Sequence, residues 1–335
     1  MVRDEVIDIL RFIGLVLIIM VHSKGSPVQA GDTFFQIRVF DVPLMLFASG
    51  LAYSQKDCGR YGDFIGKRSL RILVPCWLFL TLYFLARALF SSWGWMQAVP
   101  WKEVLCSYLF LNVGSIGYVW IFRVFLLVMF LTPFLLYLEK HASPIQFILL
   151  TVVLFSIQFI LVRVFRDSQS LFVQQVLLYA LGYSIPFLLG AKLKMASHKD
   201  SLVAFGVLAV AFTAMALMKT RQDGTWLVMQ QCKYPPGVYY LLYGAAVAAL
   251  LWATRKFWSP VLNCRLTRFI GSNTLWIYLW HIPFAPFVAS LDIPYICRFL
   301  CLSGPALALY AIQYSVVSHI RKRAKKESII LKYFA

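Results

Sequence analysis

Charged residues are scarce in this sequence, and acidic residues are the scarcest. Of 335 residues only 14% are charged and 61% are hydrophobic, with 14 Asp and Glu against 32 Lys and Arg. Soluble domains contain about 25% charged and about 45–50% apolar residues. The composition therefore excludes a soluble globular protein and predicts an integral membrane protein. The formal net charge of +18 requires no nucleic-acid partner, because membrane proteins concentrate Lys and Arg in their cytoplasmic segments.

Several other features are missing. The seven cysteines are odd in number and follow neither a disulfide framework nor a zinc spacing, so we expect no bound metal. No internal repeat is evident, which argues against the secondary transporters built from repeated halves. No loop is long enough to fold alone, so we expect residues 1–335 to form a single integral membrane domain with a short basic cytoplasmic tail at 319–335. No small-residue cleavage site follows the first apolar segment, which predicts a retained helix and not a signal peptide.

Ten apolar segments are each long enough to cross the hydrocarbon core of a bilayer, which needs about 20 helical residues. The predicted fold class is therefore all-α, a polytopic helical bundle with about ten transmembrane helices. Residues 103–116 are also apolar, but Asn112, Gly114 and Ser115 indicate a short or re-entrant helix there. The ten segments are 6–24, 34–54, 70–91, 117–138, 145–165, 171–191, 200–218, 236–254, 269–289 and 294–318.

The distribution of basic residues predicts the orientation of this bundle. With the N-terminus inside, the cytoplasmic segments hold 20 Lys and Arg and the outer segments hold nine, while Arg11, Arg123 and Arg298 fall within spans. This excess predicts that both termini are cytoplasmic. The basic cluster at residues 321–326 is then expected to anchor the end of the chain at the anionic inner leaflet.

Arg11 and His22 lie on one face of the first predicted span. They are eleven residues apart, which is about three helical turns or roughly 16 Å along the axis. Ionisable residues inside a membrane are costly and indicate a functional site. Asp8 precedes Arg11 by one turn and can pair with it. The alternative is that Arg11 snorkels toward the cytoplasm while His22 marks the outer interface.

Asp41 and His281 are expected at the same depth as His22, near the outer ends of the second and ninth spans. A carboxylate that accepts one imidazole N–H fixes the tautomer and leaves the other nitrogen as a base. Asp41 could equally cap its span or pair with Arg38. A lone histidine on an aromatic-rich helix such as that of His281 is usually structural, but a second one level with His22 is more informative.

Three further groups could contact a substrate. Arg123 follows Trp120 by three residues and lies too deep to snorkel, so we expect it to face the interior of the bundle and a polar partner. Tyr240 enters the eighth span from an outer loop, where aromatic residues suit the interface belt and can also stack on sugar rings. At the cytoplasmic mouth of the third span, basic residues either follow the positive-inside bias or hold cofactor phosphates; they are Lys67, Arg68 and Arg71.

Together these elements resemble the integral membrane acyltransferase family, the acyltransferase type 3 group of bacterial surface-polysaccharide modifiers. They occur in order over nearly the whole chain. The motifs are Ile7-Asp8-x-x-Arg11 with His22 after ten intervening positions, Asp41-Val42-Pro43-Leu44 followed by Phe47, Ser49 and Gly50, Lys67-Arg68-x-x-Arg71-Ile72-x-x-Pro75, Tyr118-x-Trp120-x-x-Arg123, and Tyr278-Leu279-x-His281-x-Pro283.

The resemblance implies ten helices and transfer of an acyl group, usually acetyl, from cytosolic acetyl-coenzyme A to an acceptor outside. It also implies that the stripe of Arg11 and His22 is essential. The acceptor would be a hydroxyl of a surface glycan or a lipid-linked oligosaccharide, and the site of action the bacterial cytoplasmic membrane. We expect four residues to act in catalysis: His22 as base, Arg11, Asp41 and Arg123. We expect the donor to bind to Lys67, Arg68 and Arg71. We expect the acceptor to bind to Trp120, Tyr240 and His281.

Two other function classes stay open from the residues alone. One is a proton-coupled transporter or flippase with a relay through Asp8, Arg11, His22 and His281. The other is a structural component of an envelope complex, for which intramembrane charges would be unnecessary. Binding of coenzyme A separates the first class from an acyltransferase. The sequence leaves open the acceptor sugar, acetyl against succinyl, a covalent acyl intermediate and the oligomeric state.

Overall fold

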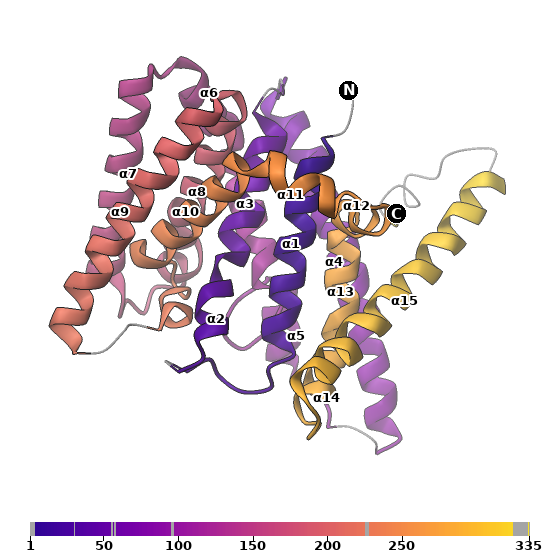
Figure 1. The fold of residues 1–335 in the computed structure, drawn as a ribbon. Coiled ribbons are helices and arrows are strands. Elements are labelled where there is room, and N and C mark those ends of the chain that lie inside the picture. The colour runs from indigo at the N-terminus through magenta and orange to yellow at the C-terminus, as the bar shows by residue number, and fades with distance from the viewer. Residues whose placement is uncertain are drawn as a thin grey trace. The chain divides into compact units, whose positions relative to one another are not determined.

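The computed structural model describes residues 4–29, 31–54, 56, 58–94, 97–224, 228–323 and 334 (Figure 1). Within these ranges every regular element is a helix. The helices are α1 (Glu5–His22), α2 (Thr33–Ile37), α3 (Asp41–Tyr53), α4 (Tyr61–Ser92), α5 (Trp101–Tyr108), α6 (Trp120–His141), α7 (Pro144–Phe165), α8 (Leu178–Met195), α9 (His198–Asp223), α10 (Val238–Ala253), α11 (Arg255–Leu262), α12 (Arg265–Ser272), α13 (Thr274–His281), α14 (Ala285–Ala289) and α15 (Tyr295–Arg323).

The predicted all-α membrane bundle is confirmed. In the described part of the chain, seven helices are long and apolar enough to cross a membrane, and the pair α10 and α11, bent by 78°, gives an eighth candidate. Two more of the predicted spans fall on α1, which carries Glu5, Asp8 and Arg11, and on the shorter apolar stretch from Thr274 to Ala289. The short helix expected within 103–116 is α5.

Three details differ from the sequence prediction. Helix α4, which corresponds to the third predicted span (70–91), begins nine residues earlier, at Tyr61. Lys67 and Arg68 therefore lie on the helix itself. The ninth predicted span, 269–289, is broken, because α12 ends at Ser272 and α13 ends before the 3₁₀ turn of Pro283. Proline lacks the backbone N–H that a continuing helix needs. In the basic tail, α15 continues to Arg323, and residues 324–333 and 335 lie outside the described part.

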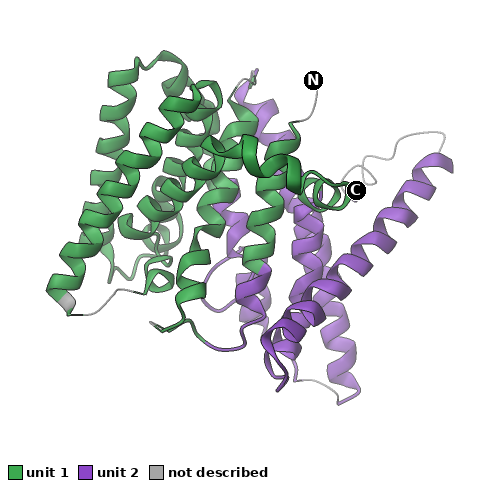
Figure 2. Cartoon of the chain, in the orientation of Figure 1, with its two compact units in different colours: residues 1–18, 27–58, 127–272 green, residues 19–26, 59–126, 273–335 purple. Residues whose placement is uncertain are grey.

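The chain divides into two compact units that alternate along the sequence (Figure 2). Neither unit is a contiguous stretch of sequence, and the division falls within α1. Each is described by itself below. Unit 1 comprises residues 1–18, 27–58 and 127–272, and unit 2 comprises residues 19–26, 59–126 and 273–335.

In unit 1, glycines allow α3 and α8 to pack with their backbones in contact. A Cβ atom on Gly50 would lie 1.9 Å from the Phe187 carbonyl oxygen, and one on Gly190 would lie 2.1 Å from the Phe47 carbonyl oxygen. Small residues at such crossings are typical of membrane bundles. The third member of the core is α10, whose Gly244 faces the ring of Pro43 in the same way.

In unit 2, α13 packs against α4 and α15, and α4 packs against α5. The Trp77 indole donates a hydrogen bond to the Tyr108 carbonyl (3.2 Å), and the Thr81 and Tyr108 hydroxyls are 2.7 Å apart. These contacts fix the short helix α5 beside α4. Every cysteine of the chain lies in the described part and is a free thiol.

Candidate active site

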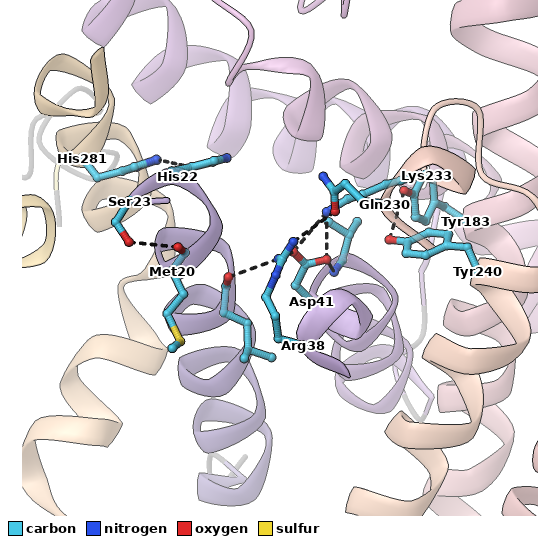
Figure 3. Close-up of polar contacts among 12 residues, drawn as sticks. Met20, His22, Ser23, Arg38, Asp41, Tyr183, Gln230, Lys233, Tyr240 and His281 are labelled. Carbon is cyan, nitrogen blue, oxygen red and sulfur yellow. Dashed lines mark hydrogen bonds and ion pairs between the residues drawn. The ribbon is translucent and has the colours of Figure 1, made fainter. Parts of the chain in front are cut away.

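His22 in the last turn of α1 lies against His281 at the end of α13, both in unit 2 (Figure 3). Their nitrogens, His22 Nδ1 and His281 Nε2, are 2.8 Å apart. The two rings are nearly parallel, with an interplanar angle of 4° and centroids 5.0 Å apart. His281 is completely buried, whereas His22 is half-buried. The structure thus brings together the two histidines that we expected at one depth.

The hydrogen bonds of this pair assign its protons. His281 Nδ1 is in hydrogen-bond contact with the Tyr278 carbonyl oxygen, which can only accept, so Nδ1 carries the proton. In a neutral imidazole the other nitrogen is then an acceptor. His281 Nε2 therefore accepts the Nδ1–H of His22. With both rings neutral, His22 Nε2 is left without a proton and can act as a base.

Aromatic rings surround the histidine pair. The Tyr118 ring meets His22 edge-on at 4.8 Å between centroids, and the Tyr278 ring meets His281 at 4.6 Å. The Tyr278 hydroxyl donates a 2.5 Å hydrogen bond to the Tyr118 carbonyl, and Phe122 packs edge-on against the Tyr278 ring. These contacts restrict the rotation of both imidazoles.

The end of α1 that carries His22 is also fixed by the first turn of α15. The last carbonyls of a helix have no partner within it. Here the Tyr295 hydroxyl donates to the Met20 carbonyl (3.0 Å), and the Arg298 guanidinium donates to the Lys24 carbonyl (2.8 Å). Gly25 turns the chain with φ +77° directly against Arg298. The sequence indicates that Arg298 lies in a span but not which groups it contacts.

Arg123 lies in the first turn of α6, one turn after the buried Trp120, and is itself buried. Its guanidinium donates to the Phe110 carbonyl (2.7 Å) and to the Asn112 side-chain oxygen (3.2 Å). The expectation that Arg123 faces the interior and a polar partner is confirmed. The partners were not predicted, because Phe110 presents its carbonyl from a left-handed backbone conformation (φ +55°) that the sequence does not indicate.

The basic residues proposed for donor binding lie on the early turns of α4, in unit 2. Lys67 and Arg71 are exposed and one turn apart, whereas Arg68 is half-buried, with its guanidinium 5.9 Å from the centroid of the Phe64 ring. An exposed pair of cations on a rigid helix is available to bind an anionic ligand. Their role in donor binding stays a prediction.

In unit 1, Arg11 pairs with Asp8 as expected, with 3.3 Å between Arg11 Nη1 and Asp8 Oδ1. Asp8 is buried, and 27% of the Arg11 side chain is exposed. Helix α12 approaches this turn closely, since a Cβ atom on Gly271 would lie 1.9 Å from the Asp8 carbonyl oxygen. The ion pair therefore sits on a backbone that α12 holds in place.

Asp41 is the centre of a buried ion cluster in unit 1 (Figure 3). Its Oδ2 lies 2.6 Å from Arg38 Nη1, and Lys233 Nζ lies 2.9 Å and 3.0 Å from its two oxygens. The Val42 N–H donates to Oδ1 (2.7 Å), and the Gln230 side-chain oxygen accepts from Arg38 Nη2 (3.0 Å). Arg38, Asp41 and Lys233 are each at most 2% exposed.

This cluster bears on the role expected for Asp41. The alternative of a pair with Arg38 is confirmed, and Lys233, which lies 192 positions away, is a partner that the sequence did not indicate. The place opposite His22 Nδ1, for which Asp41 was one candidate, is taken by His281. A direct pair between Asp41 and His22 stays a prediction.

Tyr240, expected to bind acceptor, is completely buried in unit 1. Its hydroxyl oxygen accepts a hydrogen bond from the Tyr183 hydroxyl (3.4 Å, Figure 3). A ring without exposed surface offers no face on which a sugar can stack. We therefore do not include Tyr240 in the acceptor site proposed below.

A family model matches nearly the whole chain. It describes an acyltransferase domain, and the match covers residues 4–314, from the start of α1 to well within α15. No curated protein and no solved structure matches the chain. The match confirms the resemblance carried by the motifs around Arg11, His22 and His281. The chain therefore belongs to the acyltransferase type 3 family, as a polytopic membrane acyltransferase.

Proposed function

We propose that this acyltransferase moves an acetyl group from cytosolic acetyl-coenzyme A to a hydroxyl of a surface glycan or its lipid-linked precursor, in the bacterial cytoplasmic membrane. The observation that carries the proposal is the histidine pair, in which His281 accepts the Nδ1 proton of His22 and leaves His22 Nε2 as a base. A hydroxyl is a weak nucleophile, so acyl transfer to it requires such a base.

The proposed reaction proceeds by direct attack on the thioester. The acceptor oxygen attacks the thioester carbonyl carbon while its proton moves to His22 Nε2. The bond between carbon and sulfur then breaks, and the departing thiolate of coenzyme A takes the proton from His22. During attack the imidazole of His22 becomes positive, and its Nδ1–H bond to His281 keeps the charged ring oriented.

A cation is needed where negative charge develops on the carbonyl oxygen. Arg123 is the better placed of the two candidate arginines. It is buried in the same unit as His22, and it donates hydrogen bonds to two neutral groups, the Phe110 carbonyl and the Asn112 side-chain oxygen. Arg11 is paired with the carboxylate of Asp8, which offsets its charge. We therefore assign the oxyanion contact to Arg123 and a supporting role to Arg11.

The donor would bind through its phosphates to Lys67, Arg68 and Arg71 at the cytoplasmic mouth of α4. Guanidinium groups bind phosphates with paired hydrogen bonds. Trp120, like Tyr240, is buried, so the acceptor would contact the exposed side of His22 beside the Tyr118 ring. The long arm of coenzyme A would carry the thioester from the phosphate site into the bundle.

The test is acetyl transfer by the purified full-length protein in proteoliposomes. Acetyl-coenzyme A labelled in the acetyl group is supplied with a membrane glycan extract of the producing strain, and label in the glycan is measured. We expect label to appear together with an equal amount of free thiol. Saturable binding of coenzyme A without label in any glycan fraction would contradict the proposed acceptor class, and absence of coenzyme A binding would favour the transporter or flippase.

A further inference from the structure

Helix α11 turns sharply away from α10 and presents an apolar ridge. The two helices meet at 78°, so if α10 crosses the bilayer, α11 runs close to the membrane plane. Phe257 and Val261, four residues apart on one face of α11, are 77% and 82% exposed. They are the two most exposed large apolar side chains of the described residues. We call α11 and α12 together the elbow.

Two exposed cations, Lys256 and Arg265, precede and follow this ridge in the sequence. Neither forms an ion pair with any residue in the described ranges. The other basic residues of the elbow are engaged within unit 1. The Arg255 guanidinium donates to the Trp252 carbonyl (2.7 Å) and lies 4.1 Å from the centroid of the Trp252 ring. Arg268 forms an ion pair with Glu5.

The elbow is a rigid structure and not a loose loop. The Thr267 hydroxyl donates to the Leu262 carbonyl (2.5 Å) and accepts the Cys264 N–H (3.2 Å), so it closes the corner between the two helices. The Trp258 indole donates to the Leu251 carbonyl (2.8 Å) and ties α11 back to α10. These hydrogen bonds fix α11 while Phe257 and Val261 remain exposed.

The elbow is also joined to the N-terminal end of α1. The Glu5 carboxylate accepts a hydrogen bond from the Asn263 amide (2.8 Å) and one from the Arg268 guanidinium. Gly271 of α12 packs on the Asp8 carbonyl. A ligand that fixes the position of the elbow would thereby also fix the turn of α1 that carries Asp8 and Arg11.

An apolar face between cations, on a short helix close to the membrane plane, matches the chemistry of acidic phospholipids. Such helices bury their apolar face at the level of the head groups while Lys and Arg bind anionic lipid. A neutral lipid can cover the apolar ridge but offers no net negative charge to Lys256 and Arg265. We propose that the elbow is a binding surface for anionic phospholipids of the leaflet that it faces.

The test is lipid binding to the purified full-length protein in detergent, measured by native mass spectrometry. Phosphatidylglycerol and phosphatidylcholine with identical acyl chains are the probes. We expect the wild-type protein to prefer phosphatidylglycerol, and the double variant Lys256→Gln/Arg265→Gln to lose about fivefold or more of its phosphatidylglycerol affinity, since each cation near a membrane surface contributes to anionic lipid binding. The affinity for phosphatidylcholine should not change.

The matched control is Lys140→Gln/Lys199→Gln. It removes two exposed cations from the same unit and the same expected side of the membrane, but neither residue belongs to the elbow. We expect it to keep its phosphatidylglycerol affinity. Val261→Ser should weaken both lipids and leave their ratio unchanged. Equal losses in the two double variants, or displacement of phosphatidylglycerol by acetyl-coenzyme A, would overturn the proposal.

Discussion

His22 Nδ1 lies 2.8 Å from His281 Nε2, and the far nitrogen of His281 contacts the Tyr278 carbonyl. A backbone carbonyl cannot change its role as acceptor, so the proton positions of both rings follow from it. In many catalytic histidines a carboxylate orients the ring. Here a second, completely buried imidazole occupies that place, which makes His281 a positioning residue for the proposed base.

We predict that His281→Ala lowers the acetyl-transfer rate about tenfold to a hundredfold with little change in KM. The loss arises because His22 no longer has an acceptor for its Nδ1–H and samples the wrong tautomer. His281→Gln should recover part of the rate, since its side-chain oxygen can accept that hydrogen bond. The measurement is kcat and KM for acetyl-coenzyme A in proteoliposomes. Equal losses for Ala and Gln would indicate a merely structural role.

Asp41→Asn is expected to destabilise the protein by about 3–5 kcal/mol, because it removes the buried negative charge that Arg38 and Lys233 both contact. Lys233→Met should cost less, since Asp41 keeps its contact with Arg38. Thermal unfolding in detergent measures both effects. An Asp41→Asn protein that unfolds at the wild-type temperature but fails to transfer acetyl would show instead that Asp41 acts in catalysis.

Gly271→Ala is expected to displace α12 from the turn of Asp8, because the added Cβ would lie 1.9 Å from a backbone carbonyl oxygen. We predict a clear fall in unfolding temperature and in acetyl transfer. The matched control is Gly206→Ala in α9, where no heavy atom lies within 4 Å of the added Cβ. That change should be neutral or stabilise by about 0.5–1 kcal/mol. Similar falls for both variants would contradict the close contact of α12 with α1.

The joint between the elbow and α1 should depend on pH. Hydrogen bonds from Asn263 and Arg268 lower the pKa of Glu5 below its ordinary value of 4.5. A group with a lowered pKa in the folded state stabilises it fully above the unfolded-state pKa and loses this effect as the pH falls through the folded-state pKa. Glu5→Gln should therefore unfold at a lower temperature than wild type at pH 7, and the gap should close below about pH 4.5. A gap that stays constant down to pH 3 would contradict this assignment.

The fold was largely predictable because each membrane span is recognised from one contiguous segment of the sequence. Each predicted span is a run of apolar residues whose backbone must bond internally, and the Asp8–Arg11 pair follows from a spacing of one helical turn. The elbow was missed because its cations satisfied the positive-inside count for a cytoplasmic loop. Nothing in that count distinguishes a loop from two short helices.

The site was predictable only where depth in the membrane is informative. His22 and His281 are 259 positions apart, yet their expected depths agreed. Lys233 lies between the predicted seventh and eighth spans, directly after a 3₁₀ turn at Met229–Cys232. No periodicity in the sequence reveals its burial against Asp41. The partners of Arg123 likewise depend on the left-handed conformation of Phe110.

The most direct measurement of the central claim is the acetyl content of the surface glycan in a deletion strain complemented with His22→Ala, determined by NMR and mass spectrometry. His141→Ala is the control, since His141 is exposed and contacts the Tyr137 carbonyl outside unit 2. We predict that His22→Ala inserts at the wild-type level but leaves the glycan without acetyl, whereas His141→Ala restores it. Wild-type acetylation by His22→Ala would contradict the assignment of His22 as the base.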